Sequence, residues 1–93
     1  MQDMSAGSQD DALKNKLKQM IIQACNKDID PASIGDEDSL IGQRSTVGLD
    51  SLDVLQINVA IMNEFNVRIE DSKHARRVMK SINTLADFIQ PGD

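Results

Sequence analysis

Large aromatic side chains are nearly absent from this sequence. Its 93 residues include two phenylalanines and neither tryptophan nor tyrosine. A core without large rings must be built from Leu, Ile, Val and Met, which favours packed helices over a small sheet. Hydrophobic residues make up 40% of the chain and charged residues 27%, as in a folded protein with one modest core. The sequence therefore predicts a single all-α domain.

Cysteine and long apolar runs are also scarce. Cys25 is the only cysteine, which excludes an internal disulfide and favours a reducing compartment. We expect it to be a small core residue. No apolar run approaches the length of a transmembrane helix, and the first residues lack the basic and apolar regions of a signal peptide. We therefore expect a cytoplasmic monomer that makes no membrane contact.

The net charge of −5 argues against polyanionic ligands. The basic residues around Arg76 and Arg77 have no aromatic platform on which bases could stack, so no nucleic-acid partner is expected. His74 has no cysteine or carboxylate at ligand spacing, and the acids of residues 28–38 lack the order of an EF-hand loop. We therefore expect no metal site.

The chain divides into a tail, a domain and a short end. Residues 1–9 are small and polar and predict a flexible N-terminal tail, residues 10–90 form the domain, and residues 91–93 close it. A first helix is expected over about residues 10–26, where apolar residues recur at steps of three and four. Three lysines lie off this apolar stripe and are expected to be solvated. They are Lys14, Lys16 and Lys18.

A segment of more than twenty residues follows, and three further helices complete the domain. Because so long a loop needs support, we expect its isolated apolar residues to pack on the core. These anchors are Ile29, Ile34, Leu40, Ile41 and Val47. The second helix is predicted over residues 51–65 with Asp50 as its N-cap. A short helix over residues 71–80 and a last one capped by Ser81 come next.

The predicted helix over residues 51–65 carries two apolar stripes. One consists of Val54, Ile57, Ile61 and Phe65, and the other of Leu52, Leu55, Val59 and Met62. A surface helix of a small bundle needs one such stripe. The second stripe therefore indicates either a helix wedged between two neighbours or a helix that offers an apolar face to a partner.

Ser51 lies at the start of this helix, beside the second stripe. Because Asp50 suits the cap position, the Ser51 hydroxyl can point outward, although a serine at a helix start is most often only a cap. A phosphate ester there would lie near unpaired N–H groups and the positive end of the helix dipole. No second catalytic group is visible to activate the serine, so the chain is not expected to be an enzyme.

The stretch "GLDSLDVLQINVAIMNEFNVRI" resembles the acyl carrier protein family, in which D-S-L opens the second helix and its serine carries 4′-phosphopantetheine. The likeness extends over about residues 10–89. It implies a small four-helix bundle of acyl-carrier type with a long loop between helices 1 and 2 and a short third helix. It also implies that a phosphopantetheinyl transferase attaches the arm from coenzyme A to Ser51. Ketosynthases and other acyl-processing or acyltransferase enzymes would then act on the thioesters that the arm carries.

The resemblance also assigns roles to the neighbours of Ser51. Asp50 and Leu52 would flank the attachment site. Partner enzymes would dock on Asp53, Leu55, Gln56, Val59, Met62, Arg76 and Arg77. An acyl chain would be sheltered by core residues, namely Val54, Ile57, Ile61, Phe65 and Ile69.

Several positions depart from the family pattern. Gln56 and Asn63 stand where glutamates are common, and Asn58 lies between the two apolar stripes, where it needs hydrogen-bond partners. The loop around residues 40–50 is also longer than in compact members, and the third helix is basic. These features predict a carrier for a dedicated fatty-acid, polyketide or aryl-polyene type pathway. The alternatives are a peptidyl or aminoacyl carrier, and an unmodified helical adaptor that binds through the helix over residues 51–65.

Overall fold

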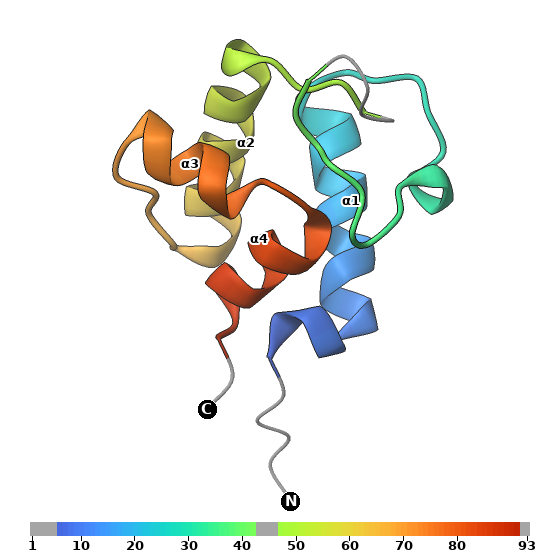
Figure 1. Ribbon diagram of the computed structural model, residues 1–93, viewed down its shortest axis with the longest axis horizontal. Helices are drawn as coiled ribbons and strands as arrows, with labels where there is room; N and C mark the ends of the chain where they lie inside the picture. Colours follow the sequence, from blue (N-terminus) through green and yellow to red (C-terminus); the bar gives the residue numbers. More distant parts are fainter. Residues whose placement is uncertain (1–5, 43–46, 92–93) are drawn as a thin grey trace, which may run out of the picture.

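The computed structural model describes residues 6–42 and 47–91 of the chain, and within these ranges it is an all-α bundle. Its helices are α1 (Asp11–Ala24), α2 (Ser51–Phe65), α3 (Ser72–Val78) and α4 (Ile82–Ile89), with one-turn 3-10 helices η1 (Gly7–Gln9) and η2 (Pro31–Ser33). In Figure 1, α1 packs against both α2 and α4, and α3 lies against α2 and α4 on the other side of the bundle. Extended pairing in the described part is confined to an isolated bridge between Ile41 and Leu49. The predicted small four-helix bundle with a long first loop and a short third helix is confirmed.

Side-chain caps fix where the helices begin. The Asp50 carboxylate accepts the Asp53 N–H at the start of α2, and the Ser81 hydroxyl accepts the Thr84 N–H at the start of α4. Both predicted caps are therefore confirmed. The predicted first and third helices are each longer than the observed α1 and α3. In α1 the reason is local, because Asn26 adopts a φ of 53° that a right-handed helix does not contain.

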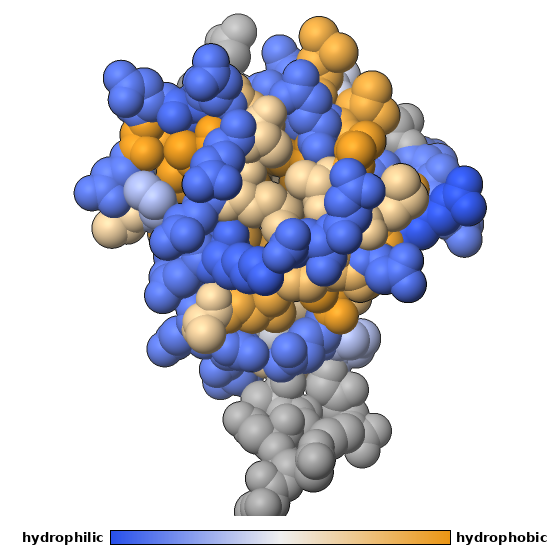
Figure 2. All heavy atoms as spheres, turned by 180° about the vertical axis from the view of Figure 1, so that it is seen from behind, coloured by the Kyte–Doolittle hydropathy of each residue, from blue (hydrophilic) through white to orange (hydrophobic). Residues whose placement is uncertain are grey.

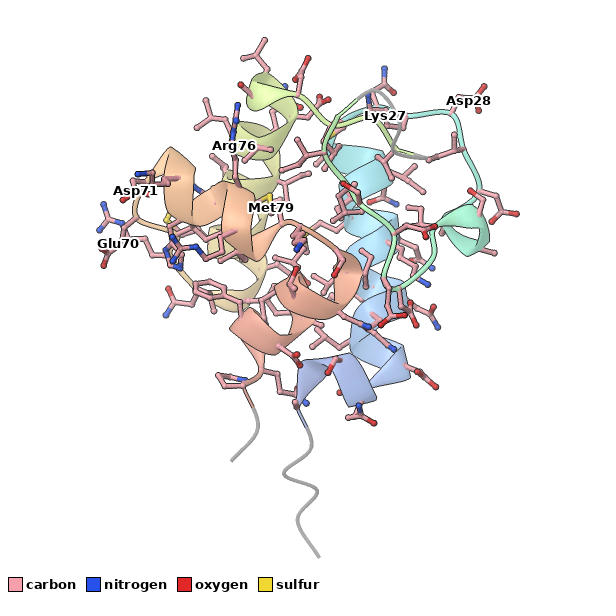
Figure 3. The ribbon with its side chains drawn as sticks, in the orientation of Figure 1. Lys27, Asp28, Glu70, Asp71, Arg76 and Met79 are labelled. Carbon is pink, nitrogen blue, oxygen red and sulfur yellow. The ribbon has the colours of Figure 1, made fainter. Side chains whose placement is uncertain are left out.

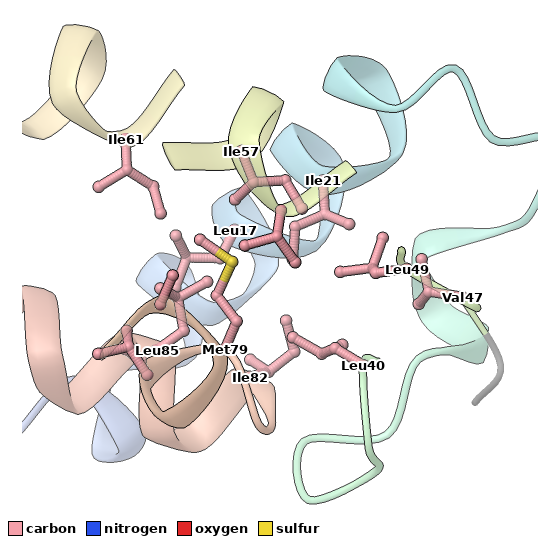
Figure 4. Close-up of a cluster of buried hydrophobic side chains, with 14 of the residues drawn as sticks. Leu17, Ile21, Leu40, Val47, Leu49, Ile57, Ile61, Met79, Ile82 and Leu85 are labelled. Atoms are coloured by element: carbon pink, nitrogen blue, oxygen red, sulfur yellow. The ribbon is translucent and has the colours of Figure 1, made fainter. Parts of the chain in front are cut away.

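The core is formed where the four helices and the long loop converge (Figure 4). Its largest fully buried side chains are Leu17, Ile21, Ile34, Leu40, Leu49, Ile57, Ile61, Met79, Ile82 and Leu85. None of them is aromatic, as the composition predicted. Interdigitated aliphatic side chains of this kind leave a small domain sensitive to the loss of single methyl groups.

The long α1–α2 loop packs on the core as predicted. Ile34, Leu40 and Val47 are buried, and the other two predicted anchors are half-buried against the same cluster. Backbone hydrogen bonds also hold the loop: the Leu40 N–H donates to the Lys80 carbonyl at 3.1 Å, and the Asn83 N–H donates to the Asp36 carbonyl at 3.0 Å. The part of the expected loop extension that falls at residues 43–46 lies outside the described residues.

Two of the three lysines expected to be solvated are instead largely buried. Lys14 Nζ lies 2.9 Å from Asp36 Oδ2, and Lys18 Nζ lies 2.8 Å from Asp36 Oδ1. Their side chains are 10% and 13% exposed. Hydrogen bonds from Lys18 and Lys14 hold the pKa of the Asp36 carboxyl below its usual value, and the same bond from Lys14 raises the Lys14 pKa. These contacts tie the loop to α1.

Residues 7–9, which fall within the predicted N-terminal tail, pack against the end of α4. These residues form η1, where the Gly7 N–H donates to the Gln90 carbonyl at 2.6 Å and the Ser8 N–H donates to Asp87 Oδ1 at 2.8 Å. A Cβ at Gly7 would overlap the carbonyl oxygen of Ala86, so this approach to α4 requires glycine. Residues 1–5 of the predicted tail, and residues 92–93 of the predicted end, lie outside the described residues.

Candidate functional site at the start of α2

Ser51 is the first residue of α2, and its side chain is exposed. Asp50 and Asp53 form a reciprocal capping box: Asp50 Oδ1 accepts the Asp53 N–H at 2.9 Å, and Asp53 Oδ2 accepts the Asp50 N–H at 3.2 Å. The serine therefore does not serve as the cap. Its hydroxyl makes no hydrogen bond to another described residue and is available to an external group.

An open groove of about 740 Å³ lies beside Ser51. It is lined by Ile41, Gly42, Leu49, Asp50, Ser51, Val54, Lys73 and Arg76. The loop and α2 supply an apolar wall, and α3 supplies the two cations. Figure 3 shows Arg76 extending from α3 toward the end of α2 at which that helix begins. The groove thus combines an apolar surface with positive charge next to an exposed hydroxyl.

The described side chains that line this groove are suited to binding an anion. Among the described residues, this lining includes neither a histidine nor a thiol, the groups that commonly activate a serine as a nucleophile. An anion near Ser51 would instead be stabilised by the first N–H groups of α2 and by the charges of Lys73 and Arg76. A phosphate ester on the serine would therefore lie close to positive charge.

The two apolar stripes of α2 separate as two faces of one helix. Val54, Ile57 and Ile61 are buried in the core, whereas the second stripe is exposed. The exposed fractions are 67% for Leu52, 58% for Leu55, 49% for Val59 and 43% for Met62. Figure 2 shows hydrophobic side chains projecting where α2 begins. The wedged-helix alternative is therefore wrong, because no neighbouring element of the described chain covers the second stripe.

The five residues predicted to shelter an acyl chain lie in two different places, the groove and the core. Val54 lines the groove beside Ser51. Ile57, Ile61 and Ile69 are buried in the core cluster, and Phe65 is half-buried with the Lys16 ammonium 5.3 Å from its ring centroid. Of these five residues, the structure brings only Val54 into the lining of the groove beside Ser51.

The predicted docking residues differ in how exposed their side chains are. Gln56 and Arg77 are exposed, as are the apolar members of the set. Asp53 is only 16% exposed in its side chain, and it is held by the capping box and by Lys27 Nζ at 3.4 Å. It therefore supports the start of α2 and offers little surface to a partner.

Sequence reasoning missed the residues that tertiary packing brings to Ser51. Ile41, Leu49 and Lys73 come from the loop and α3, and no periodic pattern links them to the start of α2. Asn58 finds its partner within the protein, since its Nδ2 donates to the Ile69 carbonyl at 3.4 Å. That contact holds the α2–α3 connector against α2. Asn58 is not among the described residues that line the groove beside Ser51.

The thiol of Cys25 lies behind the capping box, 3.7 Å from the Asp53 carbonyl oxygen. Burial, followed by the negative charge of Asp53, raises its pKa to about 11. We therefore expect iodoacetamide to alkylate the folded protein at pH 8 on the order of a hundredfold more slowly than glutathione, because the thiolate reacts and is scarce here. Mass spectrometry over time measures this rate, with urea-unfolded protein as the control. Equal rates for folded protein and glutathione would contradict the buried position.

Neither a metal site nor a membrane-spanning helix is found in the described part of the chain. No group of three His, Cys, Asp or Glu side chains there is arranged to hold a metal ion. None of the helices in that part of the chain is long and apolar enough to cross a membrane. No protein-family model matches the chain, and no curated protein matches it.

Proposed function

We propose that this chain is an acyl carrier protein whose Ser51 bears a 4′-phosphopantetheine arm. The observation that carries the proposal is the exposed Ser51 hydroxyl at the first position of a helix that Asp50 already caps. The groove beside it and the exposed stripe next to it suit an arm and an enzyme that acts on the arm. The resemblance of residues 48–69 to the carrier motif adds independent support.

The attachment is a phosphoryl-type transfer from coenzyme A. Ser51 Oγ attacks the phosphorus that bears the pantetheine, so an Oγ–P bond forms while the P–O bond to the adenosine part breaks. 3′,5′-ADP leaves, and the hydroxyl proton passes to a base of the phosphopantetheinyl transferase, since the described lining of the groove has no histidine or thiol to accept it. A divalent cation on the transferase would offset the negative charge of the pyrophosphate near Asp50 and Asp53.

The attached arm ends in a thiol that carries acyl groups as thioesters. Its phosphate would lie near the positive end of α2, Lys73 and Arg76, and its apolar part could follow Ile41, Leu49 and Val54. Ketosynthases, acyltransferases and other acyl-processing enzymes of a dedicated pathway would then dock beside Ser51. In this role the carrier catalyses nothing, because it only presents the covalently attached arm to other enzymes.

Intact-protein mass spectrometry tests the proposal. Wild-type protein is incubated with coenzyme A, Mg²⁺ and a broad-specificity phosphopantetheinyl transferase, alongside Ser51→Ala and Ser39→Ala, the latter at an exposed serine of the loop. We expect one 4′-phosphopantetheine on the wild type and on Ser39→Ala, and none on Ser51→Ala. Failure of the wild type to gain the group while a known carrier does, or modification of folded Ser51→Ala, would refute the assignment. Circular dichroism establishes that each variant is folded.

Two other functions remain alternatives. A peptidyl or aminoacyl carrier would share the modification, and loading with aminoacyl- rather than acyl-transferring enzymes would identify it. An unmodified helical adaptor is favoured by the exposed stripe of α2, which needs no arm to bind a partner. Partner binding by Ser51→Ala, together with an unmodified wild type, would establish the adaptor.

A further inference from the structure

The cations of this protein fall into two groups that occupy different parts of the fold. Lys14, Lys16, Lys18 and Lys27, from α1 and the start of the loop, all form ion pairs. The other described cations form no ion pair with any described residue, and all five are exposed. They are Arg68, Lys73, Arg76, Arg77 and Lys80. The whole unneutralised positive charge of the described chain therefore lies on the α2–α3 connector, on α3 and just after it.

These free cations border the exposed stripe of α2. Arg68 and Glu70 line a hollow of about 220 Å³ together with Val59 and Met62, near the end of α2. Lys73 and Arg76 line the groove beside Ser51, near its start. The α3 side of the stripe therefore carries exposed cations at both ends: two beside Asp50 at the start of α2, and Arg68 beside Glu70 at its end.

The side of α2 that faces α1 carries little net charge, because its two acids form ion pairs with lysines. Glu64 pairs with Lys16 at 2.7 Å, and Asp53 pairs with Lys27 at 3.4 Å. Gln56 and Asn63 add neutral polar side chains to the exposed surface of the helix. A partner that covers the stripe thus meets little net charge on one side and unpaired cations on the other.

We infer that the stripe of α2 and the cations of α3 form one docking face for a partner protein whose contacting segment carries Asp and Glu beside apolar side chains. Leu52, Leu55, Val59 and Met62 would bury against the apolar side chains, which supplies most of the affinity. The carboxylates would meet Arg68, Lys73, Arg76 and Arg77, which selects the partner and speeds its association. A partner with a basic docking surface would be repelled at this face.

The charge of the rest of the molecule favours a protein over an extended polyanion. The chain has a net charge of −5, so a nucleic acid or an anionic membrane that reached beyond the α3 cations would be repelled. Glu70 and Asp71 interrupt the row of cations, and Figure 3 shows both at the outer side of the α2–α3 connector. Carboxylates on a short amphipathic protein segment can meet the separate cations and cover the stripe at the same time.

Selection from a displayed library tests this inference with a defined probe. The library consists of short helical peptides whose exposed positions vary among Leu, Ala, Gln, Glu and Lys, and it is selected on the unmodified full-length chain. The charge-removing variant is Arg76→Gln with Arg77→Gln. Its matched control is Asn15→Glu with Gln19→Glu, which lowers the net charge by the same amount at exposed positions of α1. The inference does not rest on modification of Ser51, so Ser51→Ala should select the same peptides.

We expect the selected peptides to be rich in Glu beside Leu and to bind the Arg76/Arg77 variant about tenfold more weakly than wild type. Binding to the α1 control should change by less than about twofold, because its two substitutions lie on α1 and not on the α2–α3 face, and salt screens exposed charges. The inference is overturned if no peptide is selected, if the selected peptides are neutral or Lys-rich, or if the Arg76/Arg77 variant binds them as wild type does. Tighter binding to phosphatidylglycerol vesicles or to an oligonucleotide than to the peptides would also overturn it.

Discussion

Replacing Ile57 by alanine should lower the free energy of unfolding by about 2–5 kcal/mol, which is a large share of the total stability of a small domain. Ile57 is fully buried on the core side of α2. Truncation removes apolar contacts and leaves a cavity that the surrounding aliphatic side chains fill only in part. Urea unfolding followed by circular dichroism measures the change.

Leu55→Ala, on the same helix, is the matched control. Leu55 is 58% exposed, so its truncation should change the stability by no more than about 0.5 kcal/mol. The same variant should weaken binding of the peptides selected on the α2–α3 face, because it removes an apolar contact. Equal destabilisation by the two variants would mean that the exposed stripe is covered within the protein, and it would remove the basis for a docking face.

Replacing Asp36 by asparagine should cost about 1–3 kcal/mol of stability at neutral pH. The substitution keeps the shape of the side chain but leaves the ammonium groups of Lys14 and Lys18 without their shared carboxylate. The remaining acid near Lys14 is Asp11 at 3.6 Å, whose side chain is 92% exposed and gives weak compensation. Glu37→Gln, at an exposed position of the same loop, should change the stability by less than about 0.5 kcal/mol.

The pH dependence of this difference follows from the pKa of Asp36. Because that pKa is lower in the folded protein, the stabilisation is fully present above the unfolded value of about 3.9 and is lost as the pH falls through the folded value. The stability difference between wild type and Asp36→Asn should therefore be constant from about pH 5 to 7 and shrink below about pH 4. Since the Lys14 pKa is raised, its contribution should persist to about pH 10 and decline only as the pH passes the raised value. A difference that did not change below pH 4 would mean that Asp36 is not ionised in this network.

The features that sequence predicted well depend on local signals. The bounds of α2 follow from the cap at Asp50 and from a continuous apolar pattern up to Phe65, both of which a short window contains. Burial of Leu40 and Val47 was also predictable, because an isolated apolar residue in a polar loop has one favourable place to go. The position and exposure of Ser51 at the start of α2 were likewise predictable from the local sequence.

The features that sequence did not predict depend on residues far apart in the chain. Lys14 was expected in solvent because its partner, Asp36, lies 22 positions away in a loop without periodicity. Gly7 looked like part of a polar tail, although its lack of a side chain is what lets η1 pack on α4. The cations beside Ser51 come from α3, and only the packing of α3 against α2 places them there.

The hydrogen bond between Gly7 and Gln90 has a practical consequence for tethering the molecule. It joins the first and last parts of the described chain at one pole, whereas α2 begins at the opposite pole (Figure 1). A bead or a sensor surface coupled to the protein at the pole of Gly7 and Gln90 would therefore leave the start of α2 facing away from the support. If several copies of the domain were linked to one another at this pole, the start of α2 in each copy would face away from the linkage.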